Sequence, residues 1–292
     1  MHRKIETTNT NMKLRTILFI FCTLSIIFFN SCKRKTIEIV ENDFMQNYFL
    51  TSDTTKGAIT INIQTEIPSD FMNDSVMKSI RKTIVSGLYG SDYDTIPTDS
   101  LAKIYAAELI REYKLNNQPL LEKMDKKGSY SFDNEHILEG FSLLSDKIIF
   151  SYGISRYVYM GGAHGLNTRT FFNFDLKTGK KISENDIFIS DFEKPLTELI
   201  KTRIIEQSKE DPEIQPILTL EDTDFWVYAI KPNGNFYITD QSINYVFNPY
   251  EIAPYYMGQT EVVLSFERLK NLFKKGNIIS YLYENNESQG NK

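Results

Sequence analysis

Two adjacent stretches with different hydrophobic periods constrain the fold of this chain more than any other feature. Segment 59–67 places isoleucine at four of its five odd positions and polar residues between most of them, a period of two that indicates a half-buried strand. From Val76 to Leu88 apolar residues recur every four positions after Asn73-Asp74, which predicts a helix with Asn73 at its N-cap and an end near Gly87 or Gly90. The first half therefore packs a helix against a sheet.

The remaining periodic segments keep strands and helices apart instead of alternating them one by one. Helices are predicted after Pro97-Thr98, around Pro195, where the missing N–H of proline is tolerated, and over Glu267–Phe273. Strands are predicted over His136–Leu144 and Lys147–Met160, as a hairpin, and over Arg169–Leu176, Asn235–Thr239, Ser242–Phe247 and Glu261–Phe266. This segregation predicts an α+β fold of two small subdomains, each an antiparallel sheet packed with helices.

The N-terminus has the pattern of a bacterial export signal. A short basic stretch precedes the uncharged run Ile17–Phe29, and Ser31-Cys32 follows it. Thirteen helical residues span about 20 Å, less than the roughly 30 Å of a bilayer core, so a permanent membrane span is the weaker interpretation. Ser31-Cys32 resembles the site that lipoprotein signal peptidase reads. We therefore expect Cys32 to carry the lipid that anchors the mature protein to a membrane.

The expected domain organisation follows from this signal and from the periodic segments. We predict a signal peptide over 1–31, the acylated Cys32 with a tether over 32–44, an N-terminal subdomain over 45–165, a C-terminal subdomain over 166–275 and a tail over 276–292. The basic run Lys33–Lys35 after the cysteine favours the periplasmic face of the outer membrane. Without the signal, 29 basic and 37 acidic residues leave a net charge of −8, which opposes binding to nucleic acid.

Catalytic motifs do not emerge from the sequence. It has no Gly-x-Ser-x-Gly elbow, no His-Glu-x-x-His and no phosphate-binding glycine loop. After removal of the signal only His136 and His164 remain, and we expect no metal site and no cofactor. An enzymatic alternative would use His164 with a carboxylate such as Asp175 as an acid–base pair.

Two segments are candidate ligand-binding loops. Met160–Gly165 contains three glycines and His164, and such a loop can present backbone N–H groups to a ligand, although it can also be a simple connector. Asn248–Pro254 has two prolines and reads as a rigid loop, with tyrosines that either pack in the core or anchor a partner. The candidate ligand-binding residues are Gly161, Gly162, His164, Gly165, Tyr250, Tyr255 and Tyr256.

These same segments carry a family resemblance. Gly161–Gly165, the stretch Asn173–Lys180, and Asn248–Tyr255 with Gly258 occur in the same order in the extracellular RsiV-like module. That module is found in the anti-sigma factor RsiV and beside the catalytic domain of a peptidoglycan deacetylase, and its likeness covers roughly residues 45–275 here, the N-terminal subdomain being of the deacetylase-associated type. The resemblance implies an α+β module of two subdomains that binds a ligand, which in RsiV is lysozyme. Neither anti-sigma nor deacetylase activity is expected to carry over.

The sequence thus predicts a non-enzymatic periplasmic lipoprotein that binds a cell-envelope ligand. A lysozyme-like hydrolase is favoured by the acidity of this chain, because lysozymes are commonly basic. A peptidoglycan fragment is the second candidate ligand. The alternatives are a cell-wall-directed enzyme that uses His164 and a structural envelope lipoprotein.

Overall fold

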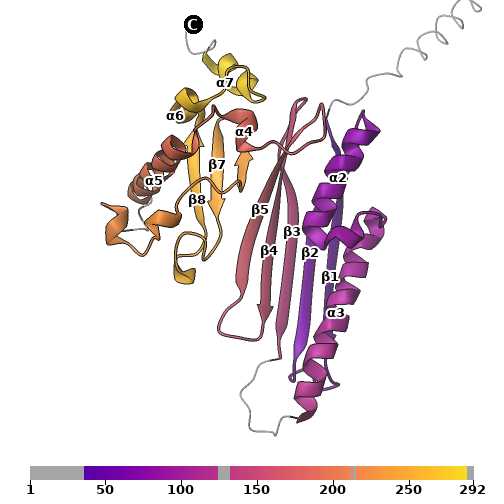
Figure 1. Ribbon diagram of the computed structural model, residues 1–292. Coiled ribbons are helices and arrows are strands. Elements are labelled where there is room, and N and C mark those ends of the chain that lie inside the picture. Colours follow the sequence, from indigo (N-terminus) through magenta and orange to yellow (C-terminus); the bar gives the residue numbers. More distant parts are fainter. Residues whose placement is uncertain (1–35, 124–131, 211, 213–214, 288–292) are drawn as a thin grey trace, which may run out of the picture. The chain divides into compact units, whose positions relative to one another are not determined.

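The computed structural model describes residues 36–123, 132–210, 212 and 215–287, and Thr36–Lys292 form one compact unit. It contains a five-stranded and a three-stranded sheet, both packed with helices (Figure 1). The predicted α+β class is confirmed. The predicted signal peptide and Cys32 lie outside the described residues. Within the described ranges, no helix is long and apolar enough to cross a membrane.

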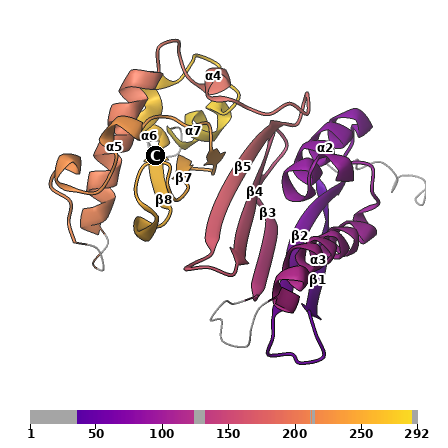
Figure 2. The same cartoon turned by 60° about the horizontal axis from the view of Figure 1, so that its bottom comes forward.

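The first sheet and its helices make up the N-terminal module, residues 36–175. Figures 1 and 2 both show its two long helices on one face of the sheet. In sheet order, the strands are β1 (Glu38–Phe49), β2 (Ala58–Asp70), β3 (Asn134–Ser145), β4 (Ile149–Met160) and β5 (Leu166–Asp175); the helices are α2 (Asp74–Tyr89) and α3 (Thr98–Lys123), with the 3-10 turn η2 (Ser91–Tyr93) between them.

This sheet is mixed, which corrects the prediction that it is antiparallel throughout. β2 and β3 run parallel, whereas the other neighbouring pairs are antiparallel. A parallel pair needs a long crossover, and α2 and α3 provide it between β2 and β3. Periodicity within each segment did not reveal this direction, since it reports the buried face of a strand and not its neighbour.

Local signals explain the elements of the N-terminal module. The Asn73 side chain accepts hydrogen bonds from the Ser75 and Val76 N–H groups, as its predicted N-cap role requires, and α2 ends at Gly90 with φ 107°. Ile61 and Ile63 of β2 are buried, as are Ile80 and Ile84 of α2, in one continuous core under the helices. The period of two in the strand and of four in the helix therefore meet in the same interior.

The C-terminal module, residues 176–287, is a small sheet with helices. Its middle strand is buried along its whole length. The strands are β6 (Phe236–Ile238), β7 (Ser242–Phe247) and β8 (Thr260–Ser265), all antiparallel. The helices are α4 (Glu184–Ile187), α5 (Glu193–Glu210), α6 (Phe266–Leu269) and α7 (Ser280–Glu287), and the 3-10 turns are η3 (Leu220–Asp222), η4 (Val227–Ala229), η5 (Tyr255–Met257) and η6 (Lys270–Leu272).

Three predicted boundaries need correction. β1 begins at Glu38, inside the segment predicted to be a tether, because it pairs with β2 over its whole length. β5 hydrogen-bonds to β4 and so belongs to the N-terminal module, which corrects its predicted place in the C-terminal subdomain. The predicted tail contains α7, and Ile279 before it is fully buried in the core of the C-terminal module.

Asparagine side chains join the two modules along the free edge of β5. The Asn173 amide donates to the Phe236 carbonyl at 2.8 Å and accepts from the Ile238 N–H at 3.1 Å. Asn235 and Asn248 reach the opposite way and bond to backbone groups of β5, each donating to the Arg169 carbonyl at 3.0 Å. These amides occupy the backbone groups that an edge strand would otherwise leave open.

Candidate functional site

The loop between β4 and β5 is built on its glycines. Gly161 has φ 72°, a left-handed conformation that favours glycine. A Cβ at Gly165 would lie 2.4 Å from the Tyr157 ring, so a larger residue would displace that ring. Gly162 has open space around it, and its carbonyl accepts a hydrogen bond from the Tyr159 hydroxyl. Two of these three glycines therefore serve the geometry of the loop.

This loop contacts the C-terminal module through His164. The His164 ring stacks on Tyr255, with centroids 3.7 Å apart and planes 15° apart. The Tyr255 hydroxyl donates to the Gly165 carbonyl at 2.6 Å, and His164 Nδ1 lies 3.1 Å from the same oxygen. Two segments about 90 residues apart in sequence thus form one contact.

Tyr250 extends this aromatic row from a strained turn. In the turn Asn248–Glu251, the Glu251 N–H donates to the Asn248 carbonyl, and Tyr250 occupies the third position with φ 71°. That position ordinarily takes glycine or asparagine, so a tyrosine there costs free energy. The residue is 53% exposed, and its ring centroid lies 5.7 Å from that of Tyr255, so the strained turn presents an aromatic side chain to solvent.

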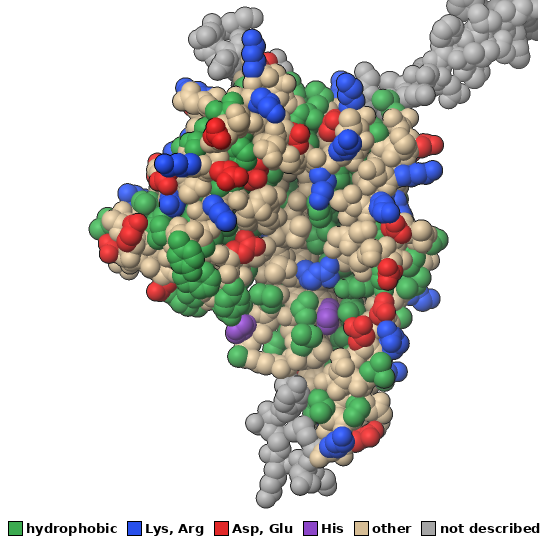
Figure 3. Space-filling view, in the orientation of Figure 1, with side chains coloured by type: hydrophobic (Ala, Val, Ile, Leu, Met, Phe, Trp, Pro, Cys, Tyr) green, Lys and Arg blue, Asp and Glu red, His purple; other side chains and the backbone are tan. Residues whose placement is uncertain are grey.

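Further large apolar side chains are exposed in the C-terminal module. Figure 3 shows hydrophobic side chains gathered over the lower loops of this module. We call the set Leu218, Tyr228, Tyr250 and Tyr256 the aromatic tip; their exposed fractions are 80%, 88%, 53% and 70%. The Tyr256 hydroxyl bonds to Asp224, which fixes one ring over the 217–230 segment.

A groove opens beside the aromatic tip between α5 and the start of β8. Its volume is about 770 Å³, in the range of ligand sites. Ile204, Ile217 and Phe225 give it apolar walls, and Arg203 and Glu261 lie at polar positions of its lining. Arg203 is held by Glu210 at 2.6 Å, so its charge is already compensated. The groove adds a concave apolar surface to a projecting aromatic one.

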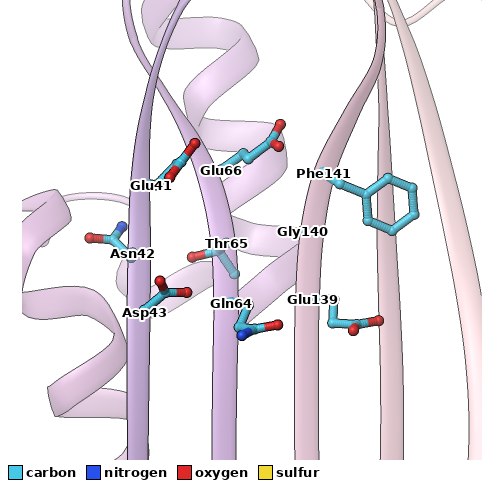
Figure 4. A pocket seen from close by; sticks show the side chains of 9 residues that line it. All are labelled: Glu41, Asn42, Asp43, Gln64, Thr65, Glu66, Glu139, Gly140 and Phe141. Atoms are coloured by element: carbon cyan, nitrogen blue, oxygen red, sulfur yellow. The ribbon is translucent and has the colours of Figure 1, made fainter.

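The face of the first sheet that the helices leave uncovered is acidic. β1 and β2 pair Glu41 with Glu66, which places both on one face, and the neighbouring pairs bring Asp43 and Glu139 to the same side. A hollow of about 450 Å³ lies there, and Figure 4 shows these carboxylates spread over β1, β2 and β3. Glu66 accepts hydrogen bonds from Ser142, but no lysine or arginine lines the hollow.

The structure brings most of the candidate residues together. Gly165, His164, Tyr255 and Tyr250 form one continuous contact, whereas Tyr256 turns toward Asp224. Sequence reasoning missed Leu218 and Tyr228, because they lie in a segment of short 3-10 turns where no period marks which side chains face outward. It also missed the asparagine amides, whose partners are remote in sequence.

The structure separates His164 from Asp175, the acid–base pair of the enzymatic alternative. His164 precedes β5 and Asp175 ends it, so a ten-residue strand of roughly 30 Å separates them. Asp175 instead accepts hydrogen bonds from the Lys177 N–H and the Thr178 hydroxyl in the following turn. Over the part of the chain that the structure describes, no group of three or more His, Cys, Asp or Glu residues is placed to hold a metal ion.

These features define a class: a two-module α+β protein with an exposed aromatic surface beside its module interface. Residues 185–267 match the family described as "Protein of unknown function (DUF3298)", and the predicted resemblance to the RsiV-like module is confirmed. A solved member of the DUF3298 family from Bacteroides fragilis has a TM-score of 0.76 and 25% identity, covering 85% of this chain and 98% of that one. A DUF3298 family protein from Pseudomonas aeruginosa shares the fold, with a TM-score of 0.52 and 15% identity over 83% of this chain and 97% of that one.

Two curated relatives come from Bacillus subtilis. The chain is 28% identical to the anti-sigma-V factor RsiV over 197 residues, which are 66% of this chain and 64% of RsiV. It is 26% identical to the peptidoglycan-N-acetylmuramic acid deacetylase PdaC over 186 residues, which are 61% of this chain and 36% of PdaC. The chain therefore spans less than two thirds of either relative.

Proposed function

We propose that this protein is a binding module of the cell envelope, without enzymatic activity of its own, and that its ligand is a basic, lysozyme-like hydrolase. The observation that carries the proposal is the meeting of the two loops that bear the family resemblance, at the His164–Tyr255 stack, beside four exposed large apolar side chains. Exposed tyrosines held by a rigid scaffold are effective anchors for a protein partner.

Electrostatics supports a basic partner. The uncovered face of the first sheet carries four carboxylates around one hollow, and no lysine or arginine lines it. Such a surface raises the association rate of a positively charged protein and makes binding sensitive to salt. The resemblance to the RsiV-like module points to the same partner class.

Titration calorimetry of the chain from Lys33 to Lys292 with a c-type lysozyme at two salt concentrations tests this function. We expect a micromolar or tighter complex that higher salt weakens. Absence of heat at both concentrations would remove lysozyme, and soluble peptidoglycan fragments would be titrated next. Failure of both would leave the structural lipoprotein as the remaining role.

The place of action is a second part of the proposal. We propose that a lipid on Cys32 anchors the chain to the periplasmic face of the outer membrane. Cells fed radiolabelled palmitate should label the wild-type protein and not Cys32→Ala. Labelling of the variant would contradict the anchor, and fractionation of the two membranes would test the outer-membrane assignment.

A further inference from the structure

The strands that end the two sheets differ in how their outer backbone groups are satisfied. β5 and β6 face each other through the asparagine amides described above. At β8, the Gln207 amide donates to the Glu261 carbonyl at 2.9 Å and accepts from the Val263 N–H at 3.0 Å. β1 is the remaining edge. Among the described residues, no side chain hydrogen-bonds to its backbone between Ile39 and Phe49, so those outer groups are open to a partner.

β1 is also the most open strand of the first sheet. None of its twelve residues is buried, whereas each of the other four strands contains buried residues. Its exposed side chains include the apolar Val40, Met45 and Phe49. A long, exposed edge with apolar side chains is a template on which another extended chain can pair, and proteins ordinarily shorten or cover such an edge. β1 is not shortened, because it pairs with β2 along its whole length.

The uncovered face of β1 determines which partner fits. The register pairs Glu41 with Glu66 and Asp43 with Gln64, so two acids of β1 lie beside a third on the same face (Figure 4). Like charges directly opposite each other destabilise a strand pair, and no lysine or arginine lines the hollow that these residues share. A basic side chain on a strand added outside β1 would offset that repulsion. Charge complementarity therefore favours a basic partner.

Farther along β1 the same face becomes apolar. Met45 and Phe49 share it with Glu41 and Asp43, because alternate residues of a strand point the same way. A matching strand carries basic side chains beside the two acids and apolar side chains beside Met45 and Phe49. A second copy of this chain does not match, since it would add the same acids to the same face. An extended segment of another protein with this alternation does match.

We propose that β1 binds an extended, basic polypeptide segment as a sixth strand of the first sheet. Main-chain hydrogen bonds to the outer edge of β1 supply affinity, and side chains at alternate positions supply specificity. The antiparallel direction is favoured, because its hydrogen-bonded pairing is slightly more stable. The inference goes beyond the proposed function, which places a folded hydrolase at the aromatic tip of the other module.

The test uses a fluorescently labelled peptide, Val-Thr-Thr-Thr-Val-Thr-Lys-Thr-Lys. When it pairs antiparallel to β1, its lysines lie beside the two acids and its valines beside the two apolar residues. Fluorescence polarisation follows its binding to the chain from Lys33 to Lys292. We expect saturable binding of this lysine peptide. The glutamate peptide, in which glutamate replaces both lysines, should bind about tenfold more weakly, because it places like charges side by side.

Charge reversal on β1 should exchange these preferences. In the variant that combines Glu41→Lys with Asp43→Lys, the lysine peptide should bind about tenfold more weakly than to the wild type, and the glutamate peptide more tightly. Both positions are exposed, so the variant should fold, and thermal unfolding checks that it does. The matched control combines Glu198→Lys with Glu267→Lys, which changes the net charge equally on exposed residues of the other module. Unchanged binding by the β1 variant would overturn the proposal.

Two N-methylated versions of the lysine peptide test the backbone pairing. Alternate N–H groups of a strand bound at this edge point toward β1, and the others point to solvent. Methyl groups on one alternate set should therefore abolish binding, whereas those on the other set should leave it intact. Equal affinity of the two versions contradicts the proposal, as does absence of saturable binding of the lysine peptide up to about 1 mM. Tyr256→Ala separates this site from the hydrolase surface, since it should bind the peptide as the wild type does. A loss of peptide binding in Tyr256→Ala would place the peptide at the tip and not on β1.

Discussion

The module interface and the aromatic tip use similar residues in opposite ways. At the interface, Tyr255 is stacked on His164 and its hydroxyl is bonded to the Gly165 carbonyl. At the aromatic tip, the next residue in the chain, Tyr256, is 70% exposed and bonds to an exposed aspartate. At the interface, polar groups form hydrogen bonds that hold the two modules together. At the tip, apolar side chains are exposed to water. Exposing apolar surface to water is unfavourable, and a contiguous exposed apolar patch is typical of a surface that a partner covers.

The largest effect is expected at the interface. Asn173→Ala removes three hydrogen bonds, to Ser151, Phe236 and Ile238, in a fully packed environment. Stranding buried partners costs about 1–3 kcal/mol each, so we expect a loss of about 3 kcal/mol in the free energy of unfolding. Urea denaturation measures it. The control is Asn167→Ala, an exposed asparagine on the same strand, which should change stability by less than about 0.5 kcal/mol.

A loss below about 1 kcal/mol in Asn173→Ala would mean that the amides do not hold the modules together. The asparagine amides would then not distinguish the interface from the tip. The His164–Tyr255 stack would be the contact that joins the modules.

The tip should respond in binding and not in stability. Tyr256→Ala or Tyr228→Ala should weaken a lysozyme complex about thirtyfold, the size of a hot-spot tyrosine, while the unfolding free energy stays within about 0.5 kcal/mol of the wild type. Leu115→Ala is the matched control, because Leu115 is 63% exposed but lies on α3 of the other module, away from both the tip and the acidic face. Calorimetry compares the three variants. Equal affinity for all of them would show that the tip is not the contact surface.

Sequence periodicity predicted most elements, since burial leaves its record within each strand and helix. The strand at Ile59–Ile67, the Asn73 cap and the hairpin at Ser145-Asp146 are all confirmed. The sequence did not predict which strands pair with one another where that pairing depends on residues far apart in the chain. The parallel pairing of β2 with β3 follows from a crossover, and the place of β5 follows from its bonds to β4. Nothing local distinguishes Tyr255 from Tyr256, because the turn η5 decides which ring meets His164.

A smaller effect separates the two hydroxyls of these adjacent tyrosines. Tyr255→Phe keeps the stack on His164 and loses only the bond to the Gly165 carbonyl, so it should cost about 1 kcal/mol in unfolding free energy. Tyr256→Phe loses a bond between exposed groups and should change stability by less than about 0.5 kcal/mol. Denaturation of both variants gives the difference directly. An equal loss of unfolding free energy in the two variants would show that the two hydroxyls contribute alike to stability, contrary to the difference proposed between the interface and the tip.

The smallest effect is expected from pH, and it tests whether acid acts on the interface or on the interior of the N-terminal module. The interface asparagines do not titrate. His136 of β3 does, and its partial burial, with the nearby Arg156 cation as a second cause, lowers its pKa below the ordinary value of 6.5. The folded state therefore holds this proton less readily than the unfolded state. The contribution to stability is present above pH 6.5 and is lost as the pH falls toward the lower folded pKa.

We expect the unfolding free energy to fall by less than about 1 kcal/mol from this source between pH 7 and pH 5, and His136→Gln to flatten that slope. Urea denaturation at the two pH values measures the change, and the proton NMR signal of the His136 ring gives its pKa independently. If the unfolding free energy of His136→Gln falls with pH as steeply as that of the wild type, and the wild-type ring titrates with an ordinary pKa, then His136 is not the source of the acid sensitivity.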